Sequence, residues 1–332
     1  MSSTIVTNAP VFGRLPAVAE ALTKGGWILD NVCPDNFNSD PEIQRATQDA
    51  LLARAHTIEY FCAGLLPVTA EFIDRAVNLK IIARHGVGYD KVDVAAATRR
   101  KIPVTNSIGS NANAVAEVSL GLLICLSRHV CKVHAAITTA GIWDRIVGTE
   151  IEGKTLGIIG LGDIGGRLAL KAKALGMKIL ANDLQPKTEF AAAHGIVMCP
   201  LPKLLAESDY VSLHIWGSRD NYHFIGENEL RQMRQDAFLL NLARGDVLDL
   251  EALARVMTQG HLAGAALDVF EEEPLARTHP IFDAPNVIFT PHIGALCKES
   301  QARMGLMNID SFAQIRAGQR PQNIVNPEIY DA

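Results

Sequence analysis

The side chains best suited to chemistry follow strand-like apolar runs in the second half of the chain. They are Arg244, three glutamates at 271–273, and His292. An arginine fork can hold a carboxylate through two hydrogen bonds, and a histidine can exchange a proton with a carbonyl or hydroxyl near neutral pH. A glutamate bonded to that histidine would fix its tautomer and favour its charged form. Each residue alone would be an ordinary surface charge, but parallel strands end at one sheet edge, so we expect the three types to share a site.

A glycine-rich turn between an apolar run and a helical pattern predicts a nucleotide site. Gly160, Gly162 and Gly165 have G-x-G-x-x-G spacing after the run at 156–159. The first glycine can turn the chain, the second lets the backbone approach a pyrophosphate, and the third lets the helix pack on its strand. Asp183 ends the next apolar run, where a carboxylate would take the ribose hydroxyls. Because Asp183 would repel a 2′-phosphate, the predicted cofactor is NAD.

The two predictions combine into one reaction class. NAD carries a hydride, while the arginine, glutamate and histidine offer a carboxylate anchor and a proton. The sequence therefore predicts hydride transfer between NAD(H) and a 2-hydroxy or 2-keto acid. An ordinary βαβ turn beside scattered surface charges is the alternative, and the shared strand-end position of these residues argues against it.

Composition narrows the class of protein. The chain has 332 residues, 48% hydrophobic and 20% charged, which is enough for about two domains. A net charge of −5 without basic clusters argues against nucleic acid or membrane surfaces as partners. No signal-like segment opens the sequence, and the six cysteines are scattered without a C-x-x-C pair. We expect a cytoplasmic protein with free thiols, and we predict no metal site.

The order of apolar runs predicts an α/β fold with two doubly wound, Rossmann-like parallel sheets and a cleft between them. A helix is predicted at 298–317, and the short tail at 323–327 should pack on the first unit. The predicted domains are a flavodoxin-like substrate-binding domain, 1–105 plus 296–332, and an NAD-binding Rossmann domain, 106–295. The predicted strands lie at 5–6, 26–32, 58–63, 79–83, 103–106, 156–159, 179–183, 196–199, 210–215, 237–242, 264–270 and 287–290.

The most apolar long stretch, residues 112–141, predicts a helix. Its uncharged core is too short to cross a bilayer. Too many of its positions are apolar for a helix with one side in solvent, so we expect it to supply a homodimer interface.

In combination, the motifs resemble the D-isomer-specific 2-hydroxyacid dehydrogenase family. The resemblance rests on the glycine run, Asn241-x-x-Arg244-Gly245, residues 266–270 followed by Glu273-Pro274, and Thr290-Pro291-His292-Ile293-Gly294. It continues through Gly86-Val87-Gly88-x-Asp90, Asn106, 115–117, Trp143, His214 and Val325-Asn326-Pro327, and so covers nearly the whole chain.

The resemblance implies a catalytic role for three residues. Arg244 would bind the carboxylate and keto oxygen of the substrate, and His292 would donate or accept the proton. Glu273, the glutamate before a proline, would be the partner of His292. Glu271 and Glu272 would then be surface residues.

The resemblance also implies the binding residues. Backbone amides around Val87 and Gly88 would hold the substrate carboxylate from the first domain, together with Arg244 and His292. Asp268 would face the nicotinamide carboxamide. The expected cofactor contacts are Gly160, Gly162, Asp163, Ile164, Asp183, His214, Ile215, Asn221, Ala243 and Asp268.

Departures from the family pattern limit what the resemblance implies. Trp216 stands where many members have proline, and Asn221 where many have threonine. Residues 62–67 lack the arginine that is usual in phosphoglycerate-type members, so a small non-phosphorylated substrate is expected. An NAD-sensing, corepressor-like binding protein on the same fold is the alternative from another class. Formate oxidation is disfavoured, because that branch has glutamine where Glu273 stands.

Overall fold

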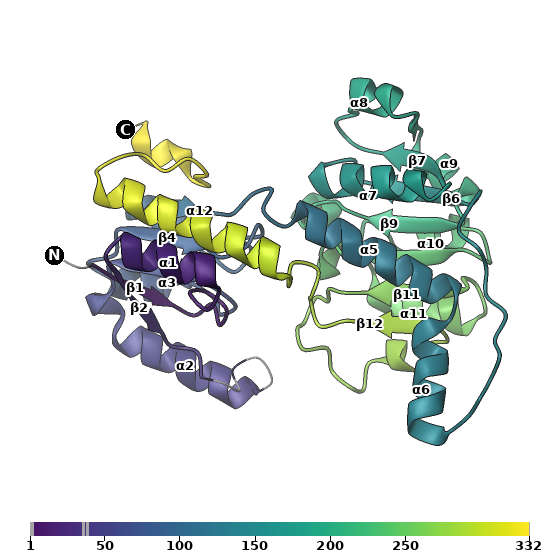
Figure 1. Cartoon of the computed structure of the whole chain (residues 1–332), viewed down its shortest axis with the longest axis horizontal. Coiled ribbons are helices and arrows are strands. Elements are labelled where there is room, and N and C mark those ends of the chain that lie inside the picture. Colours follow the sequence, from purple (N-terminus) through teal and green to yellow (C-terminus); the bar gives the residue numbers. More distant parts are fainter. Residues whose placement is uncertain (1–2, 35–36, 38–39, 332) are drawn as a thin grey trace. The chain divides into compact units, whose positions relative to one another are not determined.

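The computed structural model describes residues 3–34, 37 and 40–331, which divide into two compact units (Figure 1). The first comprises Met1–Asn111 and Leu296–Ala332, and the second Ala112–Ala295. The parts of the predicted first domain at 1–2, 35–36, 38–39 and 332 lie outside the described residues. The predicted boundary at 105/106 differs from the observed one at 111/112. Residues 106–111 stay with the first unit because Asn106 N donates to Asn323 O (3.1 Å) and Ser107 N donates to Gly86 O (2.9 Å).

A five-stranded, all-parallel sheet forms the centre of the first unit. Its order is β2-β1-β3-β4-β5. All five strands were predicted, and their ends differ from the predicted ones by at most two residues. Ile5, Phe61 and Ile82 are almost completely buried, as expected for a parallel sheet covered on both faces. The strands are β1 (Ser3–Thr7), β2 (Trp27–Asn31), β3 (Tyr60–Ala63), β4 (Ile81–Arg84) and β5 (Val104–Thr105).

Helices cover both faces of this sheet. Phe312 and Val18 belong to a core that the first and last helices form on one face, while Leu51 and Phe72 belong to the core on the other. Asp40 caps one helix, as predicted, by accepting hydrogen bonds from Glu42 N and Ile43 N. The helices are α1 (Pro16–Lys24), α2 (Pro41–Ala53), α3 (Ala70–Arg75), α4 (Val94–Arg99) and α12 (Lys298–Arg316), with the 3₁₀ turns η1 (Ala55–Thr57) and η5 (Pro327–Tyr330).

The tail after α12 packs on the first unit, as expected. Val325 N donates to Val104 O (2.7 Å), and Asn326 Oδ1 accepts from Val104 N (2.8 Å). Asn326 Nδ2 donates to Ile102 O (2.9 Å). Asn326 is completely buried, and its side-chain amide satisfies backbone groups at Ile102 and Val104 that would otherwise need a neighbouring strand.

A seven-stranded, all-parallel sheet forms the second unit, in the order β12-β11-β10-β9-β6-β7-β8. The order reverses between β6 and β9, the position at which doubly wound sheets bind ligands beyond their carboxyl ends. Strands predicted at 210–215 and 264–270 end earlier, so His214 and Asp268 lie in the loops beyond them. The strands are β6 (Thr155–Ile159), β7 (Lys178–Asn182), β8 (Val197–Met198), β9 (Tyr210–Leu213), β10 (Phe238–Asn241), β11 (Gly264–Leu267) and β12 (Val287–Phe289).

Alternate residues of these strands enter two cores. Ile158 and Leu240 face the core under α5 (Ala112–Ser127) and α7, whereas Ile159 and Leu239 face the core under α9, α10 and α11 (Figure 1). Both sheet faces are therefore buried, which leaves the strand ends for polar residues. The remaining elements are α7 (Asp163–Ala174), α8 (Thr188–Ala193), α9 (Leu201–Glu207), α10 (Glu227–Gln232), α11 (Leu250–Thr258), η2 (Arg219–Asn221), η3 (Gly245–Val247) and η4 (Pro280–Asp283).

The predicted single helix at 112–141 is wrong in one respect, because it breaks into α5 (Ala112–Ser127) and α6 (Val130–Ala140). His129 adopts a left-handed conformation at the break, with φ +54°. Ser127 fixes the end of α5, since its hydroxyl shares a hydrogen bond with Tyr210 and its carbonyl accepts from Thr149 N (both 2.8 Å). No single helix among the described residues is both long and apolar enough to cross a membrane, and α5 and α6 meet that test only as a pair bent by 67°.

Candidate active site

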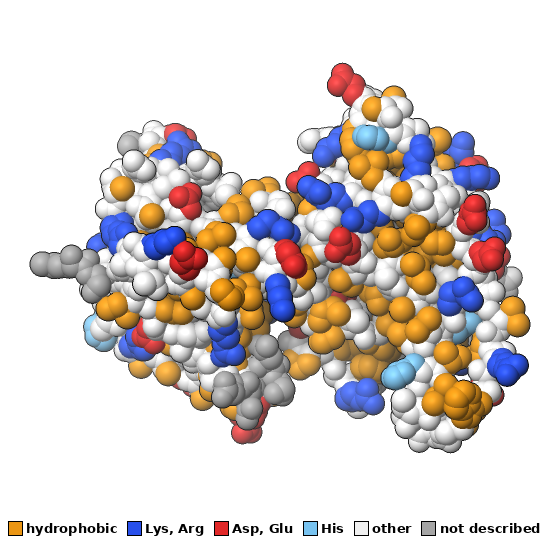
Figure 2. Space-filling view, viewed as in Figure 1, with side chains coloured by type: hydrophobic (Ala, Val, Ile, Leu, Met, Phe, Trp, Pro, Cys, Tyr) orange, Lys and Arg blue, Asp and Glu red, His pale blue; other side chains and the backbone are white. Residues whose placement is uncertain are grey.

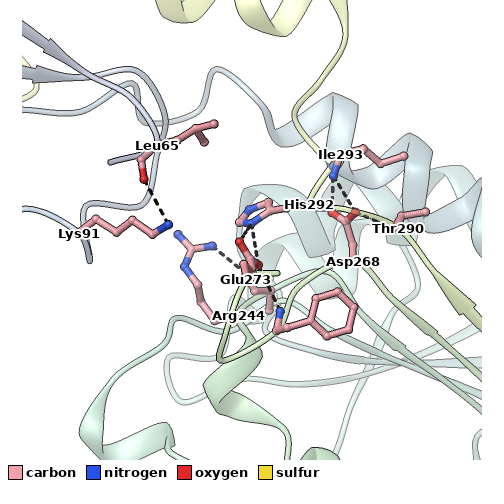
Figure 3. A network of polar contacts seen from close by, with 11 residues as sticks. Leu65, Lys91, Arg244, Asp268, Glu273, Thr290, His292 and Ile293 are labelled. Atoms are coloured by element: carbon pink, nitrogen blue, oxygen red, sulfur yellow. Dashed lines mark hydrogen bonds and ion pairs between the residues drawn. The ribbon is translucent and has the colours of Figure 1, made fainter. Parts of the chain in front are cut away.

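The imidazole of His292 lies against the carboxylate of Glu273, in the loop that follows β12 (Figure 3). His292 Nδ1 is 3.0 Å from both carboxylate oxygens. Because a carboxylate can only accept, Nδ1 carries the proton in this contact. That leaves Nε2 as the nitrogen for proton exchange. About half of the His292 side chain is exposed, so a small molecule can reach it.

Asp268 organises the loop that carries His292. Its buried carboxylate accepts from Thr290 Oγ1 (2.7 Å), Ile293 N (2.7 Å) and Gly294 N (2.9 Å). The backbone of His292 has φ +55°, and its amide donates to Asp268 O (2.9 Å). Asp268 therefore holds the loop from both its side chain and its main chain. Its expected contact with a nicotinamide carboxamide stays a prediction.

The three glutamates after β11 have different environments. Glu273 accepts from Phe270 N (3.2 Å) as well as facing His292. Glu271 is exposed, as expected of a surface residue, but its carboxylate also pairs with His223 Nε2 at 2.6 Å. Glu272 is exposed. Glu271 is therefore a surface residue with a specific partner. The sequence did not predict this partner, because His223 lies 48 residues away.

Arg244 lies in the turn after β10, and the side chain of Asn241 shapes that turn. Asn241 Oδ1 accepts from Ala243 N (3.1 Å), and Asn241 Nδ2 donates to Arg244 O (2.9 Å). The Arg244 guanidinium donates to Ala243 O (2.8 Å). A side chain at Gly217 would come within 3.0 Å of Arg244 Cγ, so another loop packs on the arginine stem. These contacts hold Arg244 at the same sheet edge as His292 and Glu273 (Figure 3).

The glycine turn after β6 has the geometry of a phosphate-binding loop. Gly160 has φ +95°, and a Cβ there would lie 2.5 Å from His214 O. A Cβ at Gly165 would collide with Gly160 O, so this glycine allows close packing of α7. A Cβ at Gly162 would meet no protein atom within 4 Å. That open space at the N-terminus of α7, beside Asp163 and Ile164, suits a pyrophosphate.

Asp183 follows β7 and faces the glycine turn. Its Oδ2 accepts from Leu161 N (2.7 Å), and its Oδ1 accepts from Gln185 N (2.9 Å). The carboxylate is therefore fixed beside the turn at the neighbouring strand end. Two ribose hydroxyls could donate to its remaining lone pairs.

The other expected cofactor contacts line adjacent strand ends. His214 N donates to Ile159 O (2.7 Å), and its Nε2 lies 2.9 Å from Ser212 Oγ. Burial lowers the pKa of His214 to about 4, so the ring is neutral at physiological pH. Asn221 Nδ2 donates to Trp216 O (2.8 Å). Ile215 is half-buried and Ala243 is buried beside Arg244.

Val87 and Gly88 belong to the first unit, in the loop after β4. Asn106 Nδ2 donates to Val87 O (2.8 Å), which connects this loop to the residue after β5. Lys91 Nζ donates to Leu65 O (3.3 Å) in the same unit (Figure 3). The contribution of Val87 and Gly88 to substrate binding stays a prediction.

Two polar features of the site region were not predicted from the sequence. One is the pair between His223 and Glu271, and the other is the set of hydrogen bonds that Asp268 receives from 290–294. Asp268 was expected only as a cofactor contact, and His223 carried no motif. In the described part of the chain, no cluster of three or more His, Cys, Asp or Glu side chains could hold a metal ion.

Comparisons with known proteins bear on the same residues. Residues 120–294 match the family model of the NAD-binding domain of D-isomer-specific 2-hydroxyacid dehydrogenases. A glyoxylate reductase of Korarchaeum cryptofilum is 38% identical over 269 residues, which cover 79% of this chain and 81% of the relative. A solved glyoxylate reductase from Paecilomyes thermophila has a TM-score of 0.80 and 28% identity, covering 98% of this chain and 99% of its own. D-Lactate dehydrogenase from Aquifex aeolicus, solved with NAD and lactic acid, has a TM-score of 0.79 and 26% identity over 97% of this chain and 99% of its own.

Proposed function

The chain belongs to the D-isomer-specific 2-hydroxyacid dehydrogenase family, and from that premise we propose that it interconverts a small, non-phosphorylated 2-keto acid and its D-2-hydroxy acid. It is an NAD-dependent oxidoreductase that acts on 2-hydroxy or 2-keto acids. The observation that carries the proposal is the 3.0 Å contact between His292 and Glu273, at the sheet edge that also carries Arg244.

Each of these three residues has one task in the proposed reaction. Arg244 holds the substrate carboxylate and keto oxygen with its planar fork. His292, protonated on both nitrogens, donates the proton on Nε2 to the keto oxygen as the alcohol forms, and takes it back in the reverse direction. Glu273 accepts from Nδ1, which orients the ring and stabilises its charged form. Bound NADH supplies the hydride.

The glycine turn and Asp183 support NAD as the cofactor. Gly162 and the first amides of α7 would hold the pyrophosphate, and Asp183 would hold the ribose. A 2′-phosphate would meet the Asp183 carboxylate as a like charge. We therefore expect a higher kcat/KM with NADH than with NADPH, and equal values would show that Asp183 is not at the ribose.

The proposed substrate is small and lacks a phosphate. Residues 62–67, at the end of β3 and in the loop after it, contain no arginine or lysine to bind one. Steady-state assays with NADH should show turnover of glyoxylate, pyruvate or a larger 2-keto acid, and lower kcat/KM for a phosphorylated analogue. NADH binding without turnover of any 2-keto acid would overturn the proposed reaction and indicate a binding protein.

We also propose that the second unit forms a homodimer through α5, α6 and the segment at 141–150. No residue of α6 is buried, although the helix is rich in apolar side chains. Trp143 and Val147 are 81% and 91% exposed. Figure 2 shows hydrophobic side chains on the face of this unit that carries α5 and α6. A surface of this kind marks an interface. Light scattering at micromolar concentration should give the mass of a dimer, and a monomer would contradict the proposal.

Cytoplasmic location is proposed on the cysteine chemistry. All six cysteines are free thiols, and Cys131 is exposed. Exposed thiols persist in a reducing compartment. Subcellular fractionation that finds the protein in an oxidising compartment would contradict this.

A further inference from the structure

A second histidine–carboxylate cluster lies in loops that follow neighbouring strands of the second unit. His223 follows β9, Asp249 follows β10 and Glu271 follows β11. His223 Nε2 is 2.6 Å from Glu271 Oε1, and His223 Nδ1 is 3.8 Å from Asp249 Oδ2. The Tyr222 ring stacks on the imidazole, with 4.0 Å between ring centroids and 15° between ring planes. One hydrogen bond, one longer ion pair and one stacked ring therefore hold the imidazole.

The main chain of His223 is joined to the loop that carries Arg244. His223 N donates to Asp246 O (2.7 Å), and Ile225 N donates to Val247 O (3.0 Å). The backbone at His223 is left-handed, with φ +50°, a conformation that histidine adopts more readily than most residues. In this conformation the amide of His223 donates to the loop that carries Arg244, while its ring contacts the loop that carries Glu271 and Glu273.

Those two loops carry the proposed catalytic groups. Asp246 is two residues beyond Arg244, and Glu271 is two residues before Glu273. The loops also touch, because a side chain at Gly245 would collide with the peptide group that leads into Glu271. A displacement of Glu271 would therefore reach Glu273 along a short stretch of backbone, and Arg244 through Gly245.

We propose that His223 is a positioning residue, which sets the placement of Arg244 relative to the Glu273–His292 pair. The inference rests on the proposed function, because it assumes that these three groups act on the substrate. The side chains of His223 and Glu271 are 31% and 40% exposed, and partly exposed ion pairs contribute little to global stability. Catalysis is more sensitive, since a misplacement of about 1 Å can cost on the order of 10²-fold in rate. The expected signature is a loss of turnover that exceeds the loss of stability.

The test compares His223→Ala, Glu271→Ala and the double variant in the full-length protein. The readouts are kcat and KM for a 2-keto acid that the wild type reduces, Kd for NADH, and the melting temperature. Either single substitution should lower kcat about tenfold, within the cost of a small misplacement, and leave Kd for NADH within about twofold. The kcat of the double variant should be no lower than that of the less active single variant, because both changes break the same contact.

Two further variants make the result specific. His223→Gln keeps a donor that can reach Glu271 and should recover most of the lost turnover, whereas Glu272→Ala should match the wild type. Near-native kcat in His223→Ala, additive losses in the double variant, or a parallel loss of NADH affinity and melting temperature would each overturn the proposal. If His223→Ala does not fold, Glu271→Ala and His223→Gln decide by the same criteria. A wild type that reduces no 2-keto acid would overturn the proposed function itself, which is seen before any variant is compared.

Discussion

Two histidines, one in each unit, occupy similar places in their sheets and have opposite environments. His85 directly follows β4, is buried, and has Nε2 2.9 Å from Gln301 Oε1 and Nδ1 3.3 Å from Asn308 Nδ2. His292 lies three residues beyond β12, is half-exposed, and has Nδ1 3.0 Å from the Glu273 carboxylate. Position beyond a strand therefore does not distinguish a structural histidine from an acid–base one.

Burial and the charge of the partner make the distinction. Burial lowers the pKa of His85 to about 4, the hydrogen bond to Gln301 opposes this shift, and the charge of Arg84 adds to it. Amide partners can satisfy a neutral ring, but they bring no charge to stabilise an imidazolium. A carboxylate does bring that charge. Between His85 and His292, exposure and a carboxylate partner distinguish the histidine suited to proton transfer.

The largest effect should come from removing the exposed histidine. His292→Ala deletes the proposed acid–base group, so turnover should fall on the order of 10²–10⁴-fold, the usual worth of such a group. NADH affinity should barely change, because the glycine turn and Asp183 are untouched. Pre-steady-state measurement of hydride transfer tests this under conditions where chemistry limits the rate. Near-native hydride transfer would show that the proton comes from another group.

The second largest effect should come from Arg244, which is proposed to hold the substrate carboxylate. Arg244→Lys replaces a planar fork with a point charge, which cannot donate two parallel hydrogen bonds to a carboxylate. We expect kcat/KM for the 2-keto acid to fall on the order of 10²-fold, the cost of losing a preorganised donor. Kd for NADH should stay near the wild-type value. A lysine variant with wild-type kcat/KM would remove Arg244 from the proposed site.

Acid should destabilise the protein through His85 and His214. The pKa values of His85 and His214 are lowered to about 4 from an ordinary 6.5, so between these values the unfolded chain binds protons that the folded chain does not. Their stabilising contribution is complete above pH 6.5 and is lost as pH falls toward 4. Each shift corresponds to at most about 3 kcal/mol. Urea unfolding at pH 7 and pH 5 measures the loss, and equal stability at both would contradict the buried neutral state.

Replacement of the buried histidine should affect stability more than chemistry. His85→Ala removes two buried hydrogen bonds and leaves a cavity, which should lower the free energy of unfolding by about 1–3 kcal/mol. The pH dependence of turnover should keep its shape, because His85 exchanges no proton in the reaction. Thermal unfolding and pH–rate profiles of the variant check the two parts. A changed profile would mean that the buried histidine also titrates during catalysis.

Much of the fold followed from local patterns. The strand runs were readable because parallel strands buried on both faces are continuously apolar, as at β6 and β10. The cap at Asp40 and the glycine turn at 160–165 depend on neighbouring residues only. Short helices such as α3 and α4 were not predicted, because six residues are too few to show a helical period.

Features that depend on distant segments could not be predicted. The break at His129 has no proline or glycine to mark it, and it depends on contacts with Tyr210 and Thr149. The pair between His223 and Glu271 joins residues 48 positions apart, and only the assembled sheet brings them together. Glu273 was singled out from the three glutamates by family resemblance, since the residues alone did not separate them. Composition at strand ends thus located the region of the site but not its internal contacts.

The smallest predicted effect isolates the charge that distinguishes His292 from His85. Glu273→Gln keeps a hydrogen-bond acceptor for His292 Nδ1 but removes the negative charge beside the ring. The amide should still orient the imidazole, so turnover should fall far less than in His292→Ala. We expect kcat to fall by at most about fivefold, the worth of a partly exposed ion pair. Steady-state assays in both directions measure this, with Glu272→Gln as the matched control that should keep the wild-type kcat. An unchanged kcat in Glu273→Gln would show that the carboxylate orients the ring without contributing its charge to the reaction.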